Sequence, residues 1–302
     1  EISCFCRSQT SSVHHTTVSQ KMTSRLRISS INEKLLNQSV TLNGWVRTRR
    51  GSKGISFIQL YDGSNQNGIQ AVADEVLENY EEISKLTTGT SVSIIGKVVE
   101  SPAKGQAFEI HAEEVRVIGV SSGDLYPLQK KGHTLEFLRE IAHLRPRTNT
   151  LGAVFRLRNT LSWAIHSFFQ ERDFLYVQTP IITANDAEGA GEMFHVTALD
   201  LENLPRNPEG KVDYSKDFFG TDVSLTVSGQ LGAEVFALAF TDVYTFGPTF
   251  RAENSNTSRH LAEFWMIEPE MAFTDLQGML VLTEEFLKYV IGVCLERHEE
   301  EL

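Results

Sequence analysis

The sequence predicts a small β barrel followed by an α+β domain. Its 302 residues are enough for two ordinary domains, and a hydrophobic content of 41% is enough to build a sizeable core. Between residues 39 and 120, short apolar stretches alternate with turns rich in glycine and asparagine, which is typical of strands. After residue 150, apolar residues recur at helical spacing and strand patterns follow.

Five strands are expected in the first domain, over residues 40–46, 55–60, 69–73, 91–99 and 108–117, with a helix over 75–86. A helix between the third and fourth of five strands is typical of an OB-fold barrel. The pattern alone leaves an SH3-like barrel open as the alternative. We expect this domain to span residues 26–120, and a linker rich in Pro, Gly and basic residues to occupy 121–150.

The second domain, residues 151–302, begins with a predicted amphipathic helix. Apolar residues recur there at helical spacing, namely Val154, Leu157, Leu161, Ile165 and Phe168. Strands are expected at 175–178, continuing into 181–182, and at 225–227, 243–246 and 263–267, with a surface insertion at 201–219 and a last helix over 276–294. We expect the side chains of Trp45 and Trp163 to lie in the core.

The composition excludes several classes of protein. Lys and Arg number 28 against 39 Asp and Glu, and the net charge of -11 excludes a generally polycationic nucleic-acid binder, although not a local basic patch. No apolar run reaches the roughly 18 to 20 residues that span a bilayer. The 3 cysteines build no disulfide framework, and the Cys4–Cys6 pair lacks the second pair that a zinc site needs. We expect a reducing compartment.

Residues 1–25 are interpreted as a disordered leader or part of a targeting segment, because residues 1–21 are rich in Ser and Thr and contain one acid. A cytoplasmic location is expected, with a mitochondrion or plastid as the alternative if residues 1–21 belong to a transit peptide. No terminal element follows the last amphipathic stretch, so the chain is expected to be a fragment.

Residues 243–273 are predicted to form a strand, a long polar loop and a returning strand. Arg251 ends the first strand, Arg259 and His260 begin the return, and Phe264 lies on the second strand. A guanidinium group binds phosphate with two parallel hydrogen bonds, and an aromatic face stacks on a base. The arrangement suits a nucleotide, although arginine on a strand more often forms a surface ion pair.

Several stretches resemble class II aminoacyl-tRNA synthetases. FRAENSNTSRHLAEF resembles motif 2, and DFLYVQTPIIT, which contains Pro180, resembles motif 1, the element that builds the dimer interface. An OB-fold before such a domain is similar to the subclass that charges Asp, Asn or Lys. AEGAGEMF and LTVSGQLGAE resemble the asparaginyl members of that subclass, and the insertion NPEGKVDYSKDFFG is similar to bacterial-type and organellar members.

The resemblance implies an ATP site with Mg²⁺ bridging the phosphates. Arg251 would be the catalytic cation that holds the α-phosphate and the substrate carboxylate. Glu253 would contact the adenine amino group, Phe264 would stack on the ring, and Arg259 and His260 would hold the outer phosphates. A purely structural histidine at a strand edge is the alternative for His260.

The resemblance also implies an amino-acid pocket. Glu188, Ser228 and Gln230 match positions that bind the substrate ammonium, which has three donors. Ala233 stands where aspartyl relatives carry a lysine in an SPQLYKQ-like segment, and Glu234 can accept from an amide while repelling a carboxylate. Both positions favour asparagine over aspartate. An aspartyl or non-discriminating enzyme is the close alternative.

The barrel is expected to read the tRNA anticodon. A basic cluster between the first two strands would track phosphates, and its members are Arg47, Arg49, Arg50 and Lys53. By resemblance, Phe57 stacks on the central anticodon base and Gln70 forms hydrogen bonds with it. The alternation along strand two leaves open that Phe57 instead faces the core.

No segment after Phe273 resembles motif 3, and the acidic Mg²⁺ ligands of the family are expected beyond Leu302. The resemblance therefore implies a homodimeric ligase that joins L-asparagine to its tRNA through an adenylate, while this chain alone is expected to be inactive. A non-catalytic module that binds tRNA or dimerises is the alternative from another class of protein.

Overall fold

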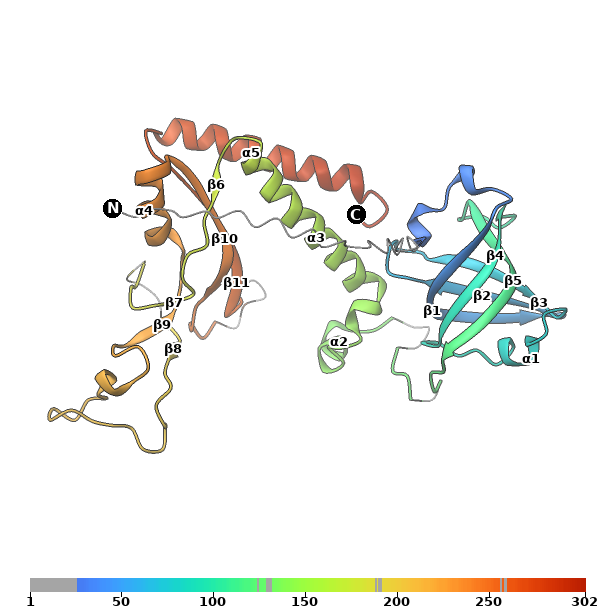
Figure 1. The fold of residues 1–302 in the computed structure, drawn as a ribbon, viewed down its shortest axis with the longest axis horizontal. Coiled ribbons are helices and arrows are strands. Elements are labelled where there is room, and N and C mark those ends of the chain that lie inside the picture. The colour runs from blue at the N-terminus through green and yellow to red at the C-terminus, as the bar shows by residue number, and fades with distance from the viewer. Residues whose placement is uncertain are drawn as a thin grey trace, which may run out of the picture. The chain divides into compact units, whose positions relative to one another are not determined.

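The computed structural model describes residues 26–123, 125–128, 132–187, 189, 192–255, 257 and 260–302. The chain folds into two compact units, with the division between Ala153 and Val154. Figure 1 shows the first unit as a barrel of strands and the second as helices packed on a sheet. The predicted leader, residues 1–25, lies outside the described residues.

The first unit is a closed five-stranded barrel. Its strands are β1 (Ser39–Ser52), β2 (Ile55–Tyr61), β3 (Ile69–Asp74), β4 (Ser91–Glu100) and β5 (Phe108–Gly119). They follow the order β1-β2-β3-β5-β4, and β3 and β5 are parallel while the other pairs are antiparallel. This is the OB-fold, not the SH3-like alternative.

The barrel core follows from the alternation of side chains along each strand. Ile58 and Leu60 on β2 and Val92 and Ile94 on β4 are completely buried, as is Ile110 on β5. Successive side chains point to opposite faces, so their neighbours in the sequence lie on the outer surface. The predicted strands are therefore confirmed, with β1 running on to Ser52 through the hairpin to β2.

The helix predicted over 75–86 is much shorter. Only α1 (Tyr80–Ile83) is helical. Turns flank it on both sides, in which the Leu77 N–H donates to the Asp74 carbonyl and the Leu86 N–H donates to the Ile83 carbonyl. These turns bring Ile83 and Leu86 into the barrel core.

The predicted linker is docked on the barrel. The Thr87 hydroxyl donates to the Ser121 carbonyl, and Arg147 donates to the Tyr126 hydroxyl while its guanidinium lies 5.2 Å from the Trp45 ring centroid. The segment also contains α2 (Leu135–Glu140) and the 3-10 turn η3 (Arg145–Arg147). Two further 3-10 turns, η1 (Ile28–Ser30) and η2 (Glu33–Leu35), precede the barrel.

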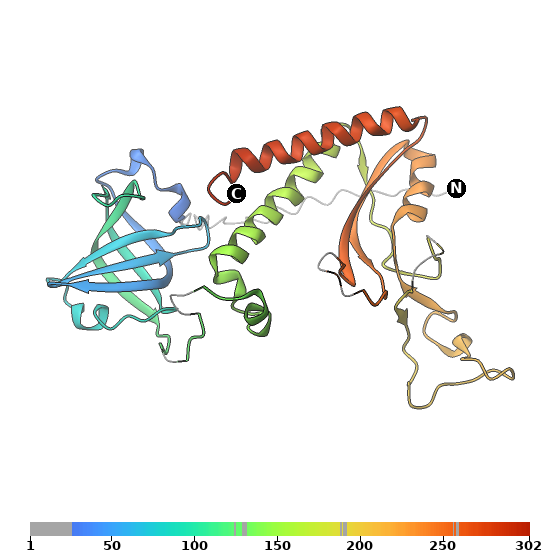
Figure 2. The same ribbon diagram turned by 180° about the vertical axis from the view of Figure 1, so that it is seen from behind.

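The second unit is built on a three-stranded sheet with the order β11-β10-β6. Its strands are β6 (Leu175–Tyr176), β10 (Asp242–Phe250) and β11 (Glu263–Met271), and the long helices are α3 (Asn149–Gln170) and α5 (Leu276–Arg297). Figures 1 and 2 show both helices on one face of this sheet. Phe168 and Phe169 from α3 pack there with Tyr244 and Phe246 from β10 and Val290 from α5.

The other face of the sheet is covered by α4 (Gln230–Phe240), which was not predicted. Ala233 and Ala237 pack against Val243 and Val177. The sequence of α4 has one charged residue, Glu234, so it lacks the polar stripe by which periodicity reveals a surface helix. Its remaining apolar side chains Leu231, Val235 and Leu238 are exposed, together with Phe236 and Phe240.

A second small sheet has the order β7-β9-β8, formed by β7 (Ile182–Thr183), β8 (His195–Val196) and β9 (Val223–Leu225). The prediction of one strand running from 175 into 181–182 is therefore wrong, because β6 and β7 belong to different sheets. Pro180 lies between them and has no N–H for a ladder. The predicted surface insertion contains the 3-10 turn η4 (Tyr214–Lys216) and an isolated bridge between Arg206 and Val212.

The expectation that Trp45 and Trp163 lie in the core is wrong. Their side chains are 37% and 47% exposed. Each ring is instead covered by an arginine, and the Arg297 guanidinium lies 4.1 Å from the Trp163 ring centroid. Among the described residues, no helix is both long and apolar enough to cross a bilayer.

Candidate functional site

One face of the β10–β11 hairpin carries several polar side chains. Thr249 pairs with Phe264 and Thr245 pairs with Glu268. Residues opposite each other in an antiparallel pair point to the same face, so all four side chains lie on the side that α4 partly covers. The other face carries Tyr244 and is filled by α3 and α5.

Arg251 and Phe264 lie together on this face, as the sequence predicted for a nucleotide site. The Arg251 guanidinium is 5.6 Å from the Phe264 ring centroid. Arg251 directly follows β10, and its N–H donates to the Ala262 carbonyl at 3.0 Å, so the hairpin fixes its backbone. The next residue, Ala252, donates to the Glu192 carbonyl at 2.7 Å, which ties the 192–194 segment to the same place.

The loop between the strands carries the other predicted ATP ligands. Glu253 and His260 are both exposed. The His260 Nδ1 lies 2.6 Å from the Ser255 hydroxyl and 2.8 Å from the Thr257 hydroxyl, so the loop holds the ring in one orientation. Arg259 lies outside the described residues.

Two of the predicted ammonium ligands lie at the start of α4: Ser228 is in the turn before the helix, and Gln230 is its first residue. Ser228 is buried, and its hydroxyl donates to Glu268 Oε1 at 2.5 Å while accepting from the Gln230 N–H at 3.1 Å. Gln230 is exposed, and its amide donates to Glu234 at 3.1 Å. The structure thus brings these residues beside one another, whereas Glu188, the third predicted ligand, lies outside the described residues.

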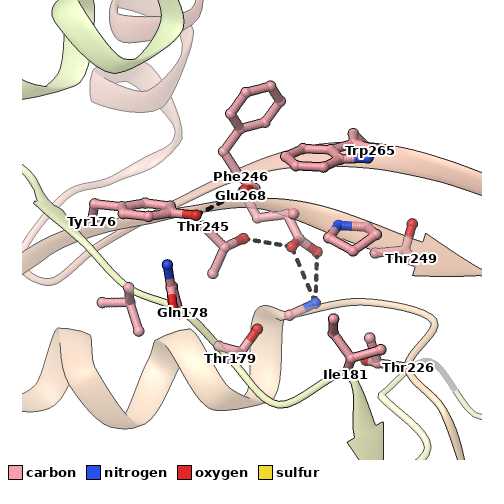
Figure 3. A pocket seen from close by; sticks show the side chains of 14 residues that line it. Tyr176, Gln178, Thr179, Ile181, Thr226, Thr245, Phe246, Thr249, Trp265 and Glu268 are labelled. Atoms are coloured by element: carbon pink, nitrogen blue, oxygen red, sulfur yellow. Dashed lines mark hydrogen bonds between the residues drawn. The ribbon is translucent and has the colours of Figure 1, made fainter. Parts of the chain in front are cut away.

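Glu268 is a site residue that the sequence analysis missed. It accepts from Ser228, from the Gly229 N–H at 3.1 Å to both carboxylate oxygens, and from the Thr245 hydroxyl at 2.6 Å. Figure 3 shows the bond from the Thr245 hydroxyl to this carboxylate. The sequence signal that could have found Glu268 is its spacing from Glu270, because residues two apart on a strand place their carboxylates on the same face.

These carboxylates create a negative region on the sheet face. The pKa of Glu270 is raised by burial and, in smaller part, by the charges of Glu234 and Glu268. Glu234 and Glu268 therefore both lie close enough to Glu270 to act on its charge. The arrangement favours a cationic or amide-bearing ligand and disfavours an anion.

Ala233 differs from the other predicted pocket residues in its surroundings. It is completely buried with Val177, Ala237 and Val243, in the contact between α4 and β10. Its side chain does not line the cavity that lies beside Glu268. The selective role that the resemblance gives to this position stays a prediction.

A cavity of about 300 Å³ lies beside the Glu268 carboxylate. Figure 3 shows that its wall combines the segment after β6 with the β10–β11 hairpin. It is lined by Tyr176, Val177, Gln178, Thr179, Ile181, Thr226, Gly229, Thr245, Phe246, Gly247, Pro248, Thr249, Trp265 and Glu268. Such a volume accommodates a small molecule with both apolar and polar groups.

The barrel carries the residues that were expected to bind RNA. Ser56 and Ile58 are buried on the inner face of β2, so Phe57 between them lies on the outer face and is half-buried. This rules out the alternative of a core phenylalanine. Gln70 also lies on the outer face, where its amide donates to Glu109 at 3.1 Å and Arg50 lies 3.5 Å from its carbonyl oxygen.

The sequence predicted one basic cluster between the first two strands, but the four basic residues do not form one. Arg47, Arg49 and Arg50 all lie within β1. Arg47 stacks on Tyr61 at 3.6 Å and donates to the Gln66 carbonyl, and Arg49 donates to the buried Ser56 hydroxyl. Alternation along β1 places Arg49 and Arg50 on opposite faces.

Lys53 is separate from these arginines, in the β1–β2 turn with φ of 45°. Arg50 is thus the member of the set that the strand register places beside Phe57, since the two residues pair directly across the hairpin.

Both units of the chain match known protein families. Residues 134–302 match the family of class II tRNA synthetases (D, K and N), and residues 40–118 match the OB-fold nucleic acid binding domain. The chain is 60% identical over 267 residues to the asparagine--tRNA ligase of Desulfitobacterium hafniense, covering 88% of this chain and 58% of that relative. The asparagine--tRNA ligase of Vibrio cholerae is also 60% identical, over 270 residues, with the same coverage of both chains.

Among solved structures, the chain resembles asparaginyl-tRNA synthetase from Pyrococcus horikoshii complexed with asparaginyl-adenylate. The TM-score is 0.77 and the identity 26%, covering 93% of this chain and 60% of that one. The chain thus spans less than two thirds of the length of these relatives. The family model covers more than half of the chain and includes both strands of the candidate site, so the chain belongs to the class II tRNA synthetases of the D, K and N group.

Proposed function

We propose that the protein activates L-asparagine with ATP and transfers it to tRNA. The observation that carries this proposal is the pairing of Arg251 with Phe264 on the sheet face that also holds Ser228 and Glu268. A phosphate-binding cation, an aromatic plane and a polar amino-acid pocket then lie on one surface. The relatives that are 60% identical and carry the name asparagine--tRNA ligase support the same reaction.

In the activation step, a carboxylate oxygen of asparagine attacks the α-phosphorus of ATP. The new bond is the mixed anhydride of the adenylate, and the bond to pyrophosphate breaks. Negative charge accumulates on the phosphoryl oxygens, where the Arg251 guanidinium stabilises it without covalent participation of the protein. Phe264 stacks on adenine, Glu253 accepts from its amino group, and His260 and Arg259 bind the outer phosphates.

The negative region on the sheet face supports asparagine as the amino acid. Ser228, Gln230 and Glu188 would bind the ammonium group. Glu234 and Glu268 bring negative charge to the pocket, which repels the carboxylate of an aspartate side chain and suits an amide NH₂. Ala233 contributes no cation that would reverse this preference.

Mg²⁺ would enter with the nucleotide. The described residues contain no group of three or more His, Cys, Asp or Glu side chains that could hold a metal ion. The chain's own acids therefore do not fit a dedicated metal centre in this part of the structure. Mg²⁺ would neutralise the phosphates that Arg251 and His260 face.

The barrel would bind the anticodon of an asparagine-accepting tRNA. Phe57 offers a half-buried ring on the outer face for stacking, and Arg50 supplies positive charge across the hairpin from it. Gln70, which is buried with its amide bonded to Glu109, and Lys53 in the β1–β2 turn would complete the contact. The docked Arg47 and Arg49 would hold the strand in shape and contribute less to phosphate binding.

We further propose that the protein forms a homodimer around Pro180. Pro180 is exposed, and three apolar side chains near it, Leu175, Ile181 and Ile182, are also exposed. Apolar side chains that cluster on a surface in this way are typical of subunit contacts.

Exchange of pyrophosphate into ATP tests the proposed activation step. It is measured on the complete reading frame with each amino acid in turn, and asparagine is expected to support it. Arg251→Ala should lower the exchange rate by about 10²-fold or more. Arg172→Ala is the matched control, because Arg172 binds Glu285 on the opposite side of the unit and should leave exchange near wild type.

Two results would contradict the proposal. If no amino acid supports exchange while the protein still binds tRNA, the non-catalytic module is the correct description. If aspartate supports exchange as well as asparagine does, the protein is a non-discriminating or aspartyl enzyme.

A further inference from the structure

The Glu268 carboxylate is held by donors from two separate segments. From the turn before α4, the Ser228 hydroxyl donates to Oε1 at 2.5 Å and the Gly229 N–H donates to both oxygens at 3.1 Å. From β10, the Thr245 hydroxyl donates to Oε2 at 2.6 Å. Figure 3 shows the Thr245 hydroxyl reaching the Glu268 carboxylate from the neighbouring strand.

These donors leave the carboxylate little freedom. A carboxylate offers about four lone-pair positions, and two hydroxyls with one shared N–H occupy at least three of them. Thr245 is buried, and its hydroxyl donates to Glu268 at 2.6 Å. The Glu268 side chain is therefore fixed in one position on the cavity wall.

Gly229 is required for this arrangement. A Cβ atom at this position would lie 2.9 Å from Glu268 Oε2 and 2.7 Å from the Thr179 hydroxyl oxygen, closer than real Cβ atoms approach. The glycine allows its own N–H to reach the carboxylate while Thr245 packs beside it, with its methyl 3.2 Å from the same Cβ position.

We infer that Thr245 is a positioning residue that sets the discrimination between asparagine and aspartate. Its hydroxyl, together with the Gly229 N–H, keeps the Glu268 charge at a fixed place in the pocket. A fixed negative charge repels a carboxylate side chain more strongly than one that can swing away. The inference rests on the proposed function, because the discrimination exists only if the pocket binds an amino acid.

A purely structural role for Thr245 predicts something different. Loss of a buried hydroxyl lowers stability and can lower activity, but it would affect asparagine and aspartate equally. A positioning role changes the ratio of the two. The ratio of kcat/KM values is therefore the informative measurement.

The experiment compares Thr245→Val, which keeps the shape and removes the hydroxyl, with Thr245→Ser, which keeps the hydroxyl. Exchange of pyrophosphate into ATP is measured on the complete reading frame with asparagine and with aspartate. Thr245→Val is expected to lower the asparagine-to-aspartate ratio of kcat/KM at least 10-fold, mainly by raising kcat/KM for aspartate, because the charge that repels its carboxylate is no longer held in place. Thr245→Ser is expected to restore the ratio.

Thr160→Val is the matched control. Thr160 is also buried and its hydroxyl is bonded to His298 on the opposite side of the unit, so the ratio should stay at the wild-type value. If Thr245→Val does not fold, Gly229→Ala provides the second variant. It keeps the N–H but pushes a methyl against Oε2, and it should lower the ratio in the same direction.

An unchanged ratio in either variant, in a protein whose wild type prefers asparagine, overturns the inference and leaves the proposed function intact. Absence of exchange by the wild type with both amino acids overturns the proposed function itself. The two failures are thus distinguishable from the wild-type measurement alone.

Discussion

Among single residues, Glu270 is a partly buried carboxyl group that lies near two other carboxylates, Glu234 and Glu268. Burial raises its pKa above the usual 4.5, and Glu234 and Glu268 raise it further. The folded state thus binds a proton more tightly than the unfolded chain. The resulting stability is present below the unfolded pKa and is lost as the pH rises through the folded pKa.

Glu270→Gln is therefore expected to raise the melting temperature of the second unit at pH 7, by a few degrees at most for a partly exposed group. The gain should vanish in melts recorded below pH 4. Glu284→Gln is the control, because Lys288 lowers the pKa of Glu284 and its removal should give no gain. A Glu270→Gln protein that is less stable than wild type at pH 7 would contradict the assignment.

Phe57 gives a second prediction at this scale. Stacking of a base on an aromatic side chain contributes about 1–3 kcal/mol, so Phe57→Ala should weaken tRNA binding by about 10-fold or more at constant salt. Phe218→Ala serves as the control, since Phe218 is an exposed phenylalanine in the other unit. Equal affinities of wild type and Phe57→Ala in a filter-binding or fluorescence titration would exclude Phe57 as the stacking residue.

Individual residues also show where sequence reasoning stops. Arg251 and Phe264 could be assigned from their places on two strands, because strand register brings them together. Glu268 could not, because its partners Ser228 and Thr245 lie 40 and 23 positions away in the sequence. Only the folded chain shows which donors a carboxylate has.

At the scale of elements, α5 depends on an N-cap. The Asp275 side chain accepts from the Gly278 N–H at 2.9 Å, which satisfies a donor that the helix itself leaves open. Asp275→Ala should lower the free energy of unfolding of the second unit by about 1 kcal/mol.

Urea denaturation followed by circular dichroism measures this change. Asp275→Asn is the informative companion, since asparagine is an equally good cap without the charge that favours a helix N-terminus. An Asn variant close to wild type attributes the effect to the cap. An Ala variant as stable as wild type would show that the helix is held by packing alone.

Elements with a clear period were predicted, whereas those without one were missed, as α4 was, or predicted too long, as α1 was. The α3 helix and the barrel strands have regular apolar spacing that solvent exposure imposes on one face. The α4 helix carries apolar residues on all sides, and α1 is too short for a period to be visible. The strand predicted across Pro180 shows a different error. Two short apolar strands were joined there, although proline has no N–H to donate to a neighbouring strand.

At the scale of the whole molecule, the exposed apolar residues around Pro180 predict self-association. Ile181→Glu is expected to convert a dimer into a monomer in sedimentation velocity, because it places a charge in an apolar contact. Leu201→Glu is the control, since Leu201 is exposed in the surface insertion away from this cluster. An Ile181→Glu protein that remains dimeric would place the interface elsewhere.

Periodicity and contiguous motifs, which are local properties of the chain, predicted the order of the two units and the family, and the family resemblance favoured the OB-type barrel over the SH3-like one that the strand pattern left open. They also placed Phe264 and Phe57 on strands and Arg251 at the end of one, but they left open which face of its strand Phe57 occupies. Only the tertiary structure decided that Arg47, Arg49 and Arg50 separate onto different partners, and that Glu268 is held by Ser228, Gly229 and Thr245. The physical reason is that charge and hydrogen-bond partners depend on distances in space, which the spacing along the chain does not contain.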